Sequence, residues 1–308
     1  MRGWWQDLTD LVLPAECGGC GRPRTVLCPE CRAALSGAAP CRVRPVPEPP
    51  GLPVVHAAAR YADAVRAVLL AHKERGALAL TAPLGAALAG AVRAGLGELG
   101  SERVGGEWTG RAESSAVGAR LGGAVPVRPR GGGIQTWARG DLSGGAPVLL
   151  VPVPSAGGAV RARGHDPARR IALAAAGELR RTGTRARVLA VLRQKRAVAD
   201  QSGLNSRQRL DNLAGALAVA PGGAGLLRGG RVVLVDDLMT TGASLTEAAR
   251  AVRAAVHGHA YEDPRTAVYA TLSRADGGQR MSGSSDAVDV ICAAVVAASP
   301  DSFEINRN

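Results

Sequence analysis

The hydrophobic pattern of the chain alternates between short apolar runs, typical of buried strands, and longer stretches with helical spacing. Strands are predicted at 147–154, 186–192 and 231–237, and the segments 266–272 and 288–296 could add two more. Helices are predicted at 61–76, 82–96, 165–181 and 244–256. Strands that are apolar on both faces and alternate with helices indicate an α/β fold, in which helices cover both faces of a parallel sheet.

Differences in composition divide the chain into four segments. Residues 1–50 hold five of the six cysteines and end in a proline-rich stretch typical of a stiff connector. Residues 51–96 are expected to form a helical lead-in to the core. Residues 97–146 are rich in Gly, Arg and Ser and lack periodicity, which predicts a flexible insertion. The alternating strands and helices place the α/β core at 147–308.

One stretch, VVLVDDLMTTGAS at 232–244, ends a strand in two acids and continues into hydroxyl side chains. We expect the strand to reach Asp236 and Asp237, a loop to cover 238–242, and a helix to begin near Ala243 or Ser244. In an open parallel sheet, ligands bind beyond the carboxyl ends of the strands. A helix N-terminus there favours phosphate, whereas paired carboxylates accept hydrogen bonds from a vicinal diol. The stretch therefore predicts a site for a ribose 5-phosphate.

Other interpretations of the same stretch remain open. An apolar strand ending in two acids also occurs as the magnesium-binding strand of P-loop NTPases, but those need G-x-x-x-x-G-K-[ST], and neither lysine of this chain follows a glycine. A response-regulator phosphoacceptor site places acids at strand ends without needing the T-T-G-A-S loop. A strand followed by a capped helix, with two solvated acids, is the purely structural alternative.

The cysteines near the N-terminus form two C-x2-C pairs, Cys17 with Cys20 and Cys28 with Cys31. Each pair can bring two thiolates to one ion, and two pairs supply a closed tetrahedral site, which predicts structural Zn²⁺. A redox-active C-x-x-C is the alternative. Cys41 stands alone, and Cys292 lies in an apolar run that indicates the core.

Charge and targeting signals narrow the classes of partner. The formal net charge is +12, and only two of the basic residues are lysines. Arginine favours planar anions, so both a phosphorylated small molecule and a nucleic acid are plausible ligands. No apolar run of membrane-spanning length and no signal peptide is recognised, so the expected location is the cytoplasm, without membrane insertion. Paired cysteines in a reducing compartment favour metal over disulfides.

The stretch VVLVDDLMTTGAS resembles the phosphoribosyl pyrophosphate (PRPP) motif of type I phosphoribosyltransferases. Further segments narrow the resemblance to the ComF family, because they occur in the order found there: CGGCGRPRTVLCPEC, YADAVRAVLLAHKERG, VPVPSAGGAVRARGHDPARRIA and QSGLNSRQRLDNLAGAL. Such proteins are similar to phosphoribosyltransferases preceded by a zinc finger and are associated with uptake of transforming DNA. The resemblance implies a type I phosphoribosyltransferase-like parallel sheet flanked by helices, with a small N-terminal four-cysteine zinc finger.

The resemblance also implies roles for individual residues. The PRPP-binding set would be Asp236 and Asp237 on the ribose hydroxyls, Thr240, Thr241, Gly242, Ala243 and Ser244 on the 5-phosphate, Ser155 in the pyrophosphate loop, and Lys73 at the end of the family's first helix. Residues 194–212 occupy the place of the flexible loop that closes over PRPP, and Mg²⁺ would accompany the pyrophosphate. Asp166 and Pro167 replace the family's Asn-Gln, and they suit the N-cap and first position of a helix.

Two functions follow as hypotheses. The first is an enzyme that transfers phosphoribose from PRPP to an acceptor that the sequence does not identify. The second is a non-catalytic module of the same fold that contacts single-stranded DNA or a competence helicase. The scarcity of aromatic residues disfavours extensive base stacking in the second case.

Overall fold

The computed structural model describes residues 16–105, 146–155, 160–161, 164–196, 198, 203, 205–259 and 290–306. Within them the main feature is a six-stranded sheet in the order β1-β2-β8-β7-β3-β4. Its strands are β1 (Cys41–Val43), β2 (Val55–Arg60), β3 (Val148–Pro152), β4 (Ala186–Val188), β7 (Arg231–Met239) and β8 (Val290–Ala298). Neighbouring strands are parallel throughout, except that β1 runs antiparallel to β2.

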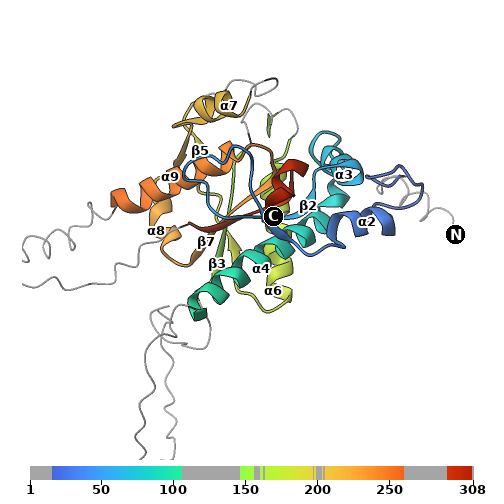
Figure 1. Cartoon of the computed structure of the whole chain (residues 1–308), viewed down its shortest axis with the longest axis horizontal. Helices are drawn as coiled ribbons and strands as arrows, with labels where there is room; N and C mark the ends of the chain where they lie inside the picture. The colour runs from blue at the N-terminus through green and yellow to red at the C-terminus, as the bar shows by residue number, and fades with distance from the viewer. Residues whose placement is uncertain are drawn as a thin grey trace, which may run out of the picture.

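Helices cover both faces of this sheet (Figure 1). On one face, α4 (Thr81–Gly105) and α6 (Pro167–Arg181) pack over Val233, Val235 and Ala294. On the other face, α9 (Ala243–His259) packs over Val232 and Leu234. The central strands are therefore buried on both sides, as their unbroken apolar runs indicate.

Smaller elements surround the two layers. A second sheet pairs β5 (Leu192–Gln194) with β6 (Leu217–Val219) in antiparallel fashion, and α7 (Ser206–Leu213) lies between them in the sequence. The remaining elements are α2 (Pro29–Ser36), α3 (Asp63–Lys73), α8 (Gly223–Leu227) and the 3-10 helices η1 (Leu78–Leu80) and η2 (Pro300–Asn306). The two-stranded sheet of β5 and β6 and helix α8 pack on the face covered by α9.

The prediction of an α/β fold with a parallel sheet between helices is confirmed, and most predicted elements form. Asp166 caps α6 as expected, since its carboxylate accepts a hydrogen bond from Arg169 N–H, and Pro167 is the first helical residue. Strand β2 is different, because it lies in the segment predicted as a helical lead-in. Helix α4 also continues to Gly105, past the predicted boundary at residue 97. The strand prediction at 266–272 and residues 106–145 of the predicted insertion lie outside the described residues.

Helix α4 also corrects the expectation that no segment has the length of a membrane span. Within the described residues, the stretch Leu78–Glu98 is long and apolar enough by length and composition to cross a membrane. Half of it is buried inside the protein, where α4 packs against α6, β8 and β2. A helix at the centre of a folded core passes the same test.

Candidate functional site

The carboxyl ends of four parallel strands meet at one edge of the sheet. Arg60 at the end of β2 and Met239 at the end of β7 both pair with Ala298 of β8, and Pro152 of β3 pairs with Val235. Loops that follow β3 and β7 therefore begin close together. This is the edge at which ligands bind in open α/β sheets.

Two adjacent acids stand near the end of β7, which continues through them to Met239. The carboxylate of Asp237 is buried and forms an ion pair with Lys73, with 3.0 Å between Oδ2 and Nζ. Lys73 is the last residue of α3 and is about one-third exposed, so the pair is reached from solvent on the lysine side. The structure thus joins two of the predicted site residues directly.

Asp236 differs from Asp237 in its surroundings, because it lines the hollow formed by the following loop. Burial and the negative charge of Asp237 raise its pKa well above the usual range, and Lys73 offsets this only in part. The N–H of Asp237 donates a 2.8 Å hydrogen bond to Asp236 Oδ1. Among the described residues, Lys73 therefore acts on both carboxyl groups, and its ion pair is with Asp237.

The loop after β7 encloses a small hollow with a volume of about 30 Å³. All five residues predicted to hold a phosphate line it, namely Thr240, Thr241, Gly242, Ala243 and Ser244. Helix α9 begins at Ala243, and the first N–H groups of a helix have no partner within it. Hydroxyl groups and helix N–H groups therefore surround a space that admits a small polar group.

Gly242 is required by the backbone of this loop and by its neighbours. Its φ of +77° lies in the left-handed region. A Cβ at this position would lie 3.1 Å from Leu52 Cδ2 and 3.4 Å from Pro45 Cγ. The segment after β1 thus covers the outside of the loop, which holds the hollow in shape.

The loop after β3 places a third group of residues near this edge. Ser155 lies three positions after the end of β3, and its hydroxyl donates a 3.4 Å hydrogen bond to Asp166 Oδ1 at the start of α6. His165 and His72 pack edge to face, with ring centroids 5.9 Å apart. Burial is the main cause, and the nearby His165 the second, of a pKa of His72 that is lowered to about 4. His72 is therefore neutral at physiological pH.

Helix α7 brings in a residue that the sequence reading missed. Arg209 Nη1 donates a hydrogen bond of 3.4 Å to Thr240 Oγ1, so the guanidinium lies beside the hollow. The family resemblance predicts a flexible loop at 194–212, and α7 forms part of that segment. The signal for the helix was Asn205 followed by Gln208, which form a capping box.

The four cysteines of the two C-x2-C pairs come together as predicted. Their sulphur atoms all lie within 4.8 Å of one another, and Cys20 and Cys28 are 3.6 Å apart. A tetrahedral site with Zn–S bonds of about 2.3 Å separates its sulphur atoms by about 3.8 Å. The cluster could therefore bind a metal ion, and its size and ligand type are consistent with structural zinc.

Backbone N–H groups favour the ionised, thiolate form of Cys17 in this cluster. Burial opposes ionisation of Cys17, but hydrogen bonds from the N–H groups of Cys28, Cys20 and Gly19 outweigh it and lower its pKa to about 6. Burial and the neighbouring thiols raise the pKa of Cys31 well above its usual range. A divalent cation would displace the proton from such a thiol, as metal binding by cysteine requires.

The cysteine cluster is packed into the main body of the protein. Cys17, Cys28 and Cys31 belong to the same buried cluster as Val68 of α3 and Leu80 of η1. A Cβ at Gly18 would lie 2.6 Å from Leu80 Cδ1, so the backbone between Cys17 and Cys20 packs closely against η1. The cluster therefore supports α3, the helix that ends at Lys73.

The remaining sequence predictions have clear locations. Cys292 is fully buried, as predicted, and Cys41 is exposed on β1. No protein-family model matches the chain, and no curated protein matches its sequence. The resemblance to the ComF family accordingly rests on the motifs themselves.

Proposed function

We propose that this protein is a phosphoribosyltransferase-like protein of the ComF type that binds PRPP at the end of β7. The observation that carries the proposal is the continuity of β7, two acids, a hydroxyl-rich loop and the start of α9 around one hollow. In this proposal Asp236 and Asp237 accept hydrogen bonds from the ribose hydroxyls. Residues 240–244 donate hydrogen bonds to the 5-phosphate.

The other predicted residues have supporting roles in the same proposal. Lys73 holds the carboxylate of Asp237 in place through their ion pair. The loop that contains Ser155 follows β3 at the same edge and would bind the pyrophosphate, with Mg²⁺ neutralising part of its charge. Loss of pyrophosphate from the ribose creates positive charge at the anomeric carbon, and the two carboxylates would stabilise that charge. Such a site acts through positioning and electrostatics.

Calorimetry with two ligands tests the assignment. PRPP with Mg²⁺ should bind the wild-type protein, and Asp236→Asn should weaken that binding because charge-assisted hydrogen bonds are about twice as strong as neutral ones. The same change should leave binding of inorganic phosphate intact or improved, since it removes a repulsive charge. Thr241→Val should weaken both ligands. The exposed Asp301→Asn is the matched control.

Two results would contradict the proposal. Equal losses for both ligands in Asp236→Asn would mean that the acid supports the loop and does not contact the ribose. Unchanged PRPP affinity in every variant would place the site elsewhere. Release of pyrophosphate, measured with a panel of acceptor bases, then distinguishes a transferase from a protein that only binds PRPP.

A second candidate function is binding of single-stranded DNA, favoured by a basic hollow at the opposite edge of the sheet. This hollow has a volume of about 280 Å³ and is lined by Arg180, Arg185 and Arg187, with no acid among its lining residues in the described part of the chain. Phosphates bound there would release counterions. Changing Arg185 and Arg187 to Gln together should lower the salt slope of DNA affinity by about 2; an unchanged slope would exclude this surface.

A further inference from the structure

The proposed phosphate site has a charge problem that its own residues do not solve. The residues that line the hollow are neutral apart from Asp236, which is acidic. The nearby Lys73 is engaged by Asp237. A phosphate dianion in the hollow would therefore meet a carboxyl group with no basic residue among the lining side chains. Helix N–H groups contribute only a partial positive charge.

Arg209 lies where the missing cation is needed. Its Nη1 reaches Thr240 Oγ1 of the loop, and its Nε is buried without a hydrogen-bond partner among the described residues. A guanidinium carries five N–H donors in a rigid fork, which matches a phosphate in two-point contacts. The buried Nε donor is one that a bound anion could satisfy, and an unsatisfied buried donor is otherwise costly.

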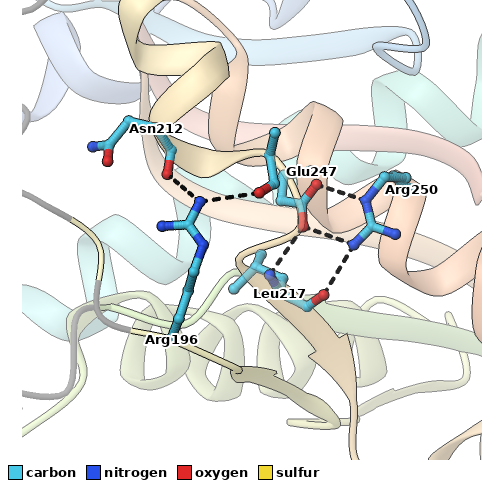
Figure 2. Close-up of polar contacts among 6 residues, drawn as sticks. Arg196, Asn212, Leu217, Glu247 and Arg250 are labelled. Carbon is cyan, nitrogen blue, oxygen red and sulfur yellow. Dashed lines mark hydrogen bonds and ion pairs between the residues drawn. The ribbon is translucent and has the colours of Figure 1, made fainter.

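Helix α7, which carries Arg209, packs against α9, and polar contacts hold the end of α7 and the strand that follows it (Figure 2). Arg196 Nη2 donates to the carbonyls of Asn212 and Ala214 at the end of α7, at 2.8 and 3.0 Å. The next residues are held by α9, because buried Glu247 accepts a hydrogen bond from Leu217 N–H and Arg250 donates to Leu217 O.

These contacts hold the backbone of α7 close to the helix that follows the loop. Helix α9 begins at the loop that contains Thr240, and it also binds the strand that follows α7. The two residues of the Arg209–Thr240 contact therefore lie on segments that are both attached to α9. Side chains held on packed helices position a ligand more accurately than a free loop does.

We propose that Arg209 binds the 5-phosphate of the ligand and supplies the positive charge that the loop after β7 lacks. This inference rests on the proposed function, because it takes the hollow to be a phosphate site. Arg209 would add a contact from α7, which lies outside the stretch 232–244. Its charge explains why a neutral loop beside two acids can bind an anion. The phosphate would be held between the guanidinium of Arg209 and the helix start at Ala243.

Titration with ribose 5-phosphate and with PRPP tests the inference on the full chain. Arg209→Gln should weaken both ligands about 10- to 100-fold, the value of one or two charge-assisted hydrogen bonds. Arg209→Lys should retain part of the affinity, since it keeps the charge, and Arg207→Gln is the control, because Arg207 is an exposed arginine of the same helix. The salt dependence of ribose 5-phosphate binding should fall in Arg209→Gln alone.

The outcomes separate the inference from the function on which it rests. If the wild type binds both ligands and Arg209→Gln binds them equally well, the inference is wrong and the proposed site stands. If Arg207→Gln loses as much ligand affinity as Arg209→Gln, a specific charge contact of Arg209 is excluded. The same conclusion follows if Arg209→Lys binds the ligands no more tightly than Arg209→Gln. If the wild type binds neither ligand, both proposals fail. Thr240→Val, which removes the loop partner and keeps the cation, should lose less than Arg209→Gln.

Discussion

Replacing Asp236 by Asn should stabilise the fold while it impairs PRPP binding. Among the described residues, Lys73 is the cation near Asp236, and it pairs at 3.0 Å with Asp237. Its raised pKa follows from burial and from the adjacent Asp237. An amide of nearly the same shape removes the charge and can still accept the hydrogen bond from Asp237 N–H.

The expected gain is about 1 to 2 kcal/mol in the free energy of unfolding at pH 8, in the range found for substitutions that relieve strain at functional sites. For a domain of this size, about 1 kcal/mol corresponds to roughly 2 to 4 °C in melting temperature. The gain depends on pH with a defined sign. A raised folded-state pKa means that the wild type loses stability as pH rises from the unfolded value of about 4 toward the folded value.

Urea denaturation followed by circular dichroism at several pH values measures this difference. The advantage of Asp236→Asn over the wild type should be small near pH 5 and should grow toward pH 8. Asp301→Asn, at an exposed position, should show no such trend. A variant that is less stable than the wild type at pH 8, or whose advantage is constant with pH, would refute this account of the acidic pair.

Three further outcomes are expected. Lys73→Met should cost about 2 kcal/mol of stability in chemical denaturation, less than a fully buried pair because the lysine is partly exposed, and adding Asp237→Asn should recover most of it; a purely additive loss would argue against the pair. Metal analysis should find about one zinc per chain, and Cys17→Ser should weaken PRPP binding, since the cluster supports α3; unchanged affinity would contradict that support. Glu247→Leu should cost about 2 kcal/mol and lower the hydrogen-exchange protection of the Leu217 N–H, because leucine cannot accept that hydrogen bond; unchanged protection would rule the contact out.

Elements with strong local signals could be predicted from the sequence. The unbroken apolar run of β7, the capped start of α6 and the paired cysteines each depend on residues close together in the chain. Strand β2 could not be predicted in this way, because its sequence VHAAAR has little intrinsic preference for a strand. It forms because it pairs with β8, beneath a helix that approaches closely at Gly95, where a Cβ would lie 2.9 Å from Cys292 Sγ.

The candidate site was predictable only where it coincides with a continuous motif. The acids and the loop after β7 are adjacent in the sequence, so their chemistry could be read directly. The pairing of Lys73 with Asp237 could be suggested only by family resemblance, since it depends on how α3 and β7 pack. The contact of Arg209 with Thr240 depends on how α7 packs against α9, and no local pattern encodes it.

Binding of a phosphoribosyl ligand by the loop after β7 can be checked by a crystal structure of the protein with PRPP and Mg²⁺. We expect the 5-phosphate to lie against the N–H groups at the start of α9, with the ribose hydroxyls on Asp236 and Asp237. PRPP bound at another surface, or a hollow that stays filled only by solvent at saturating PRPP, would contradict it.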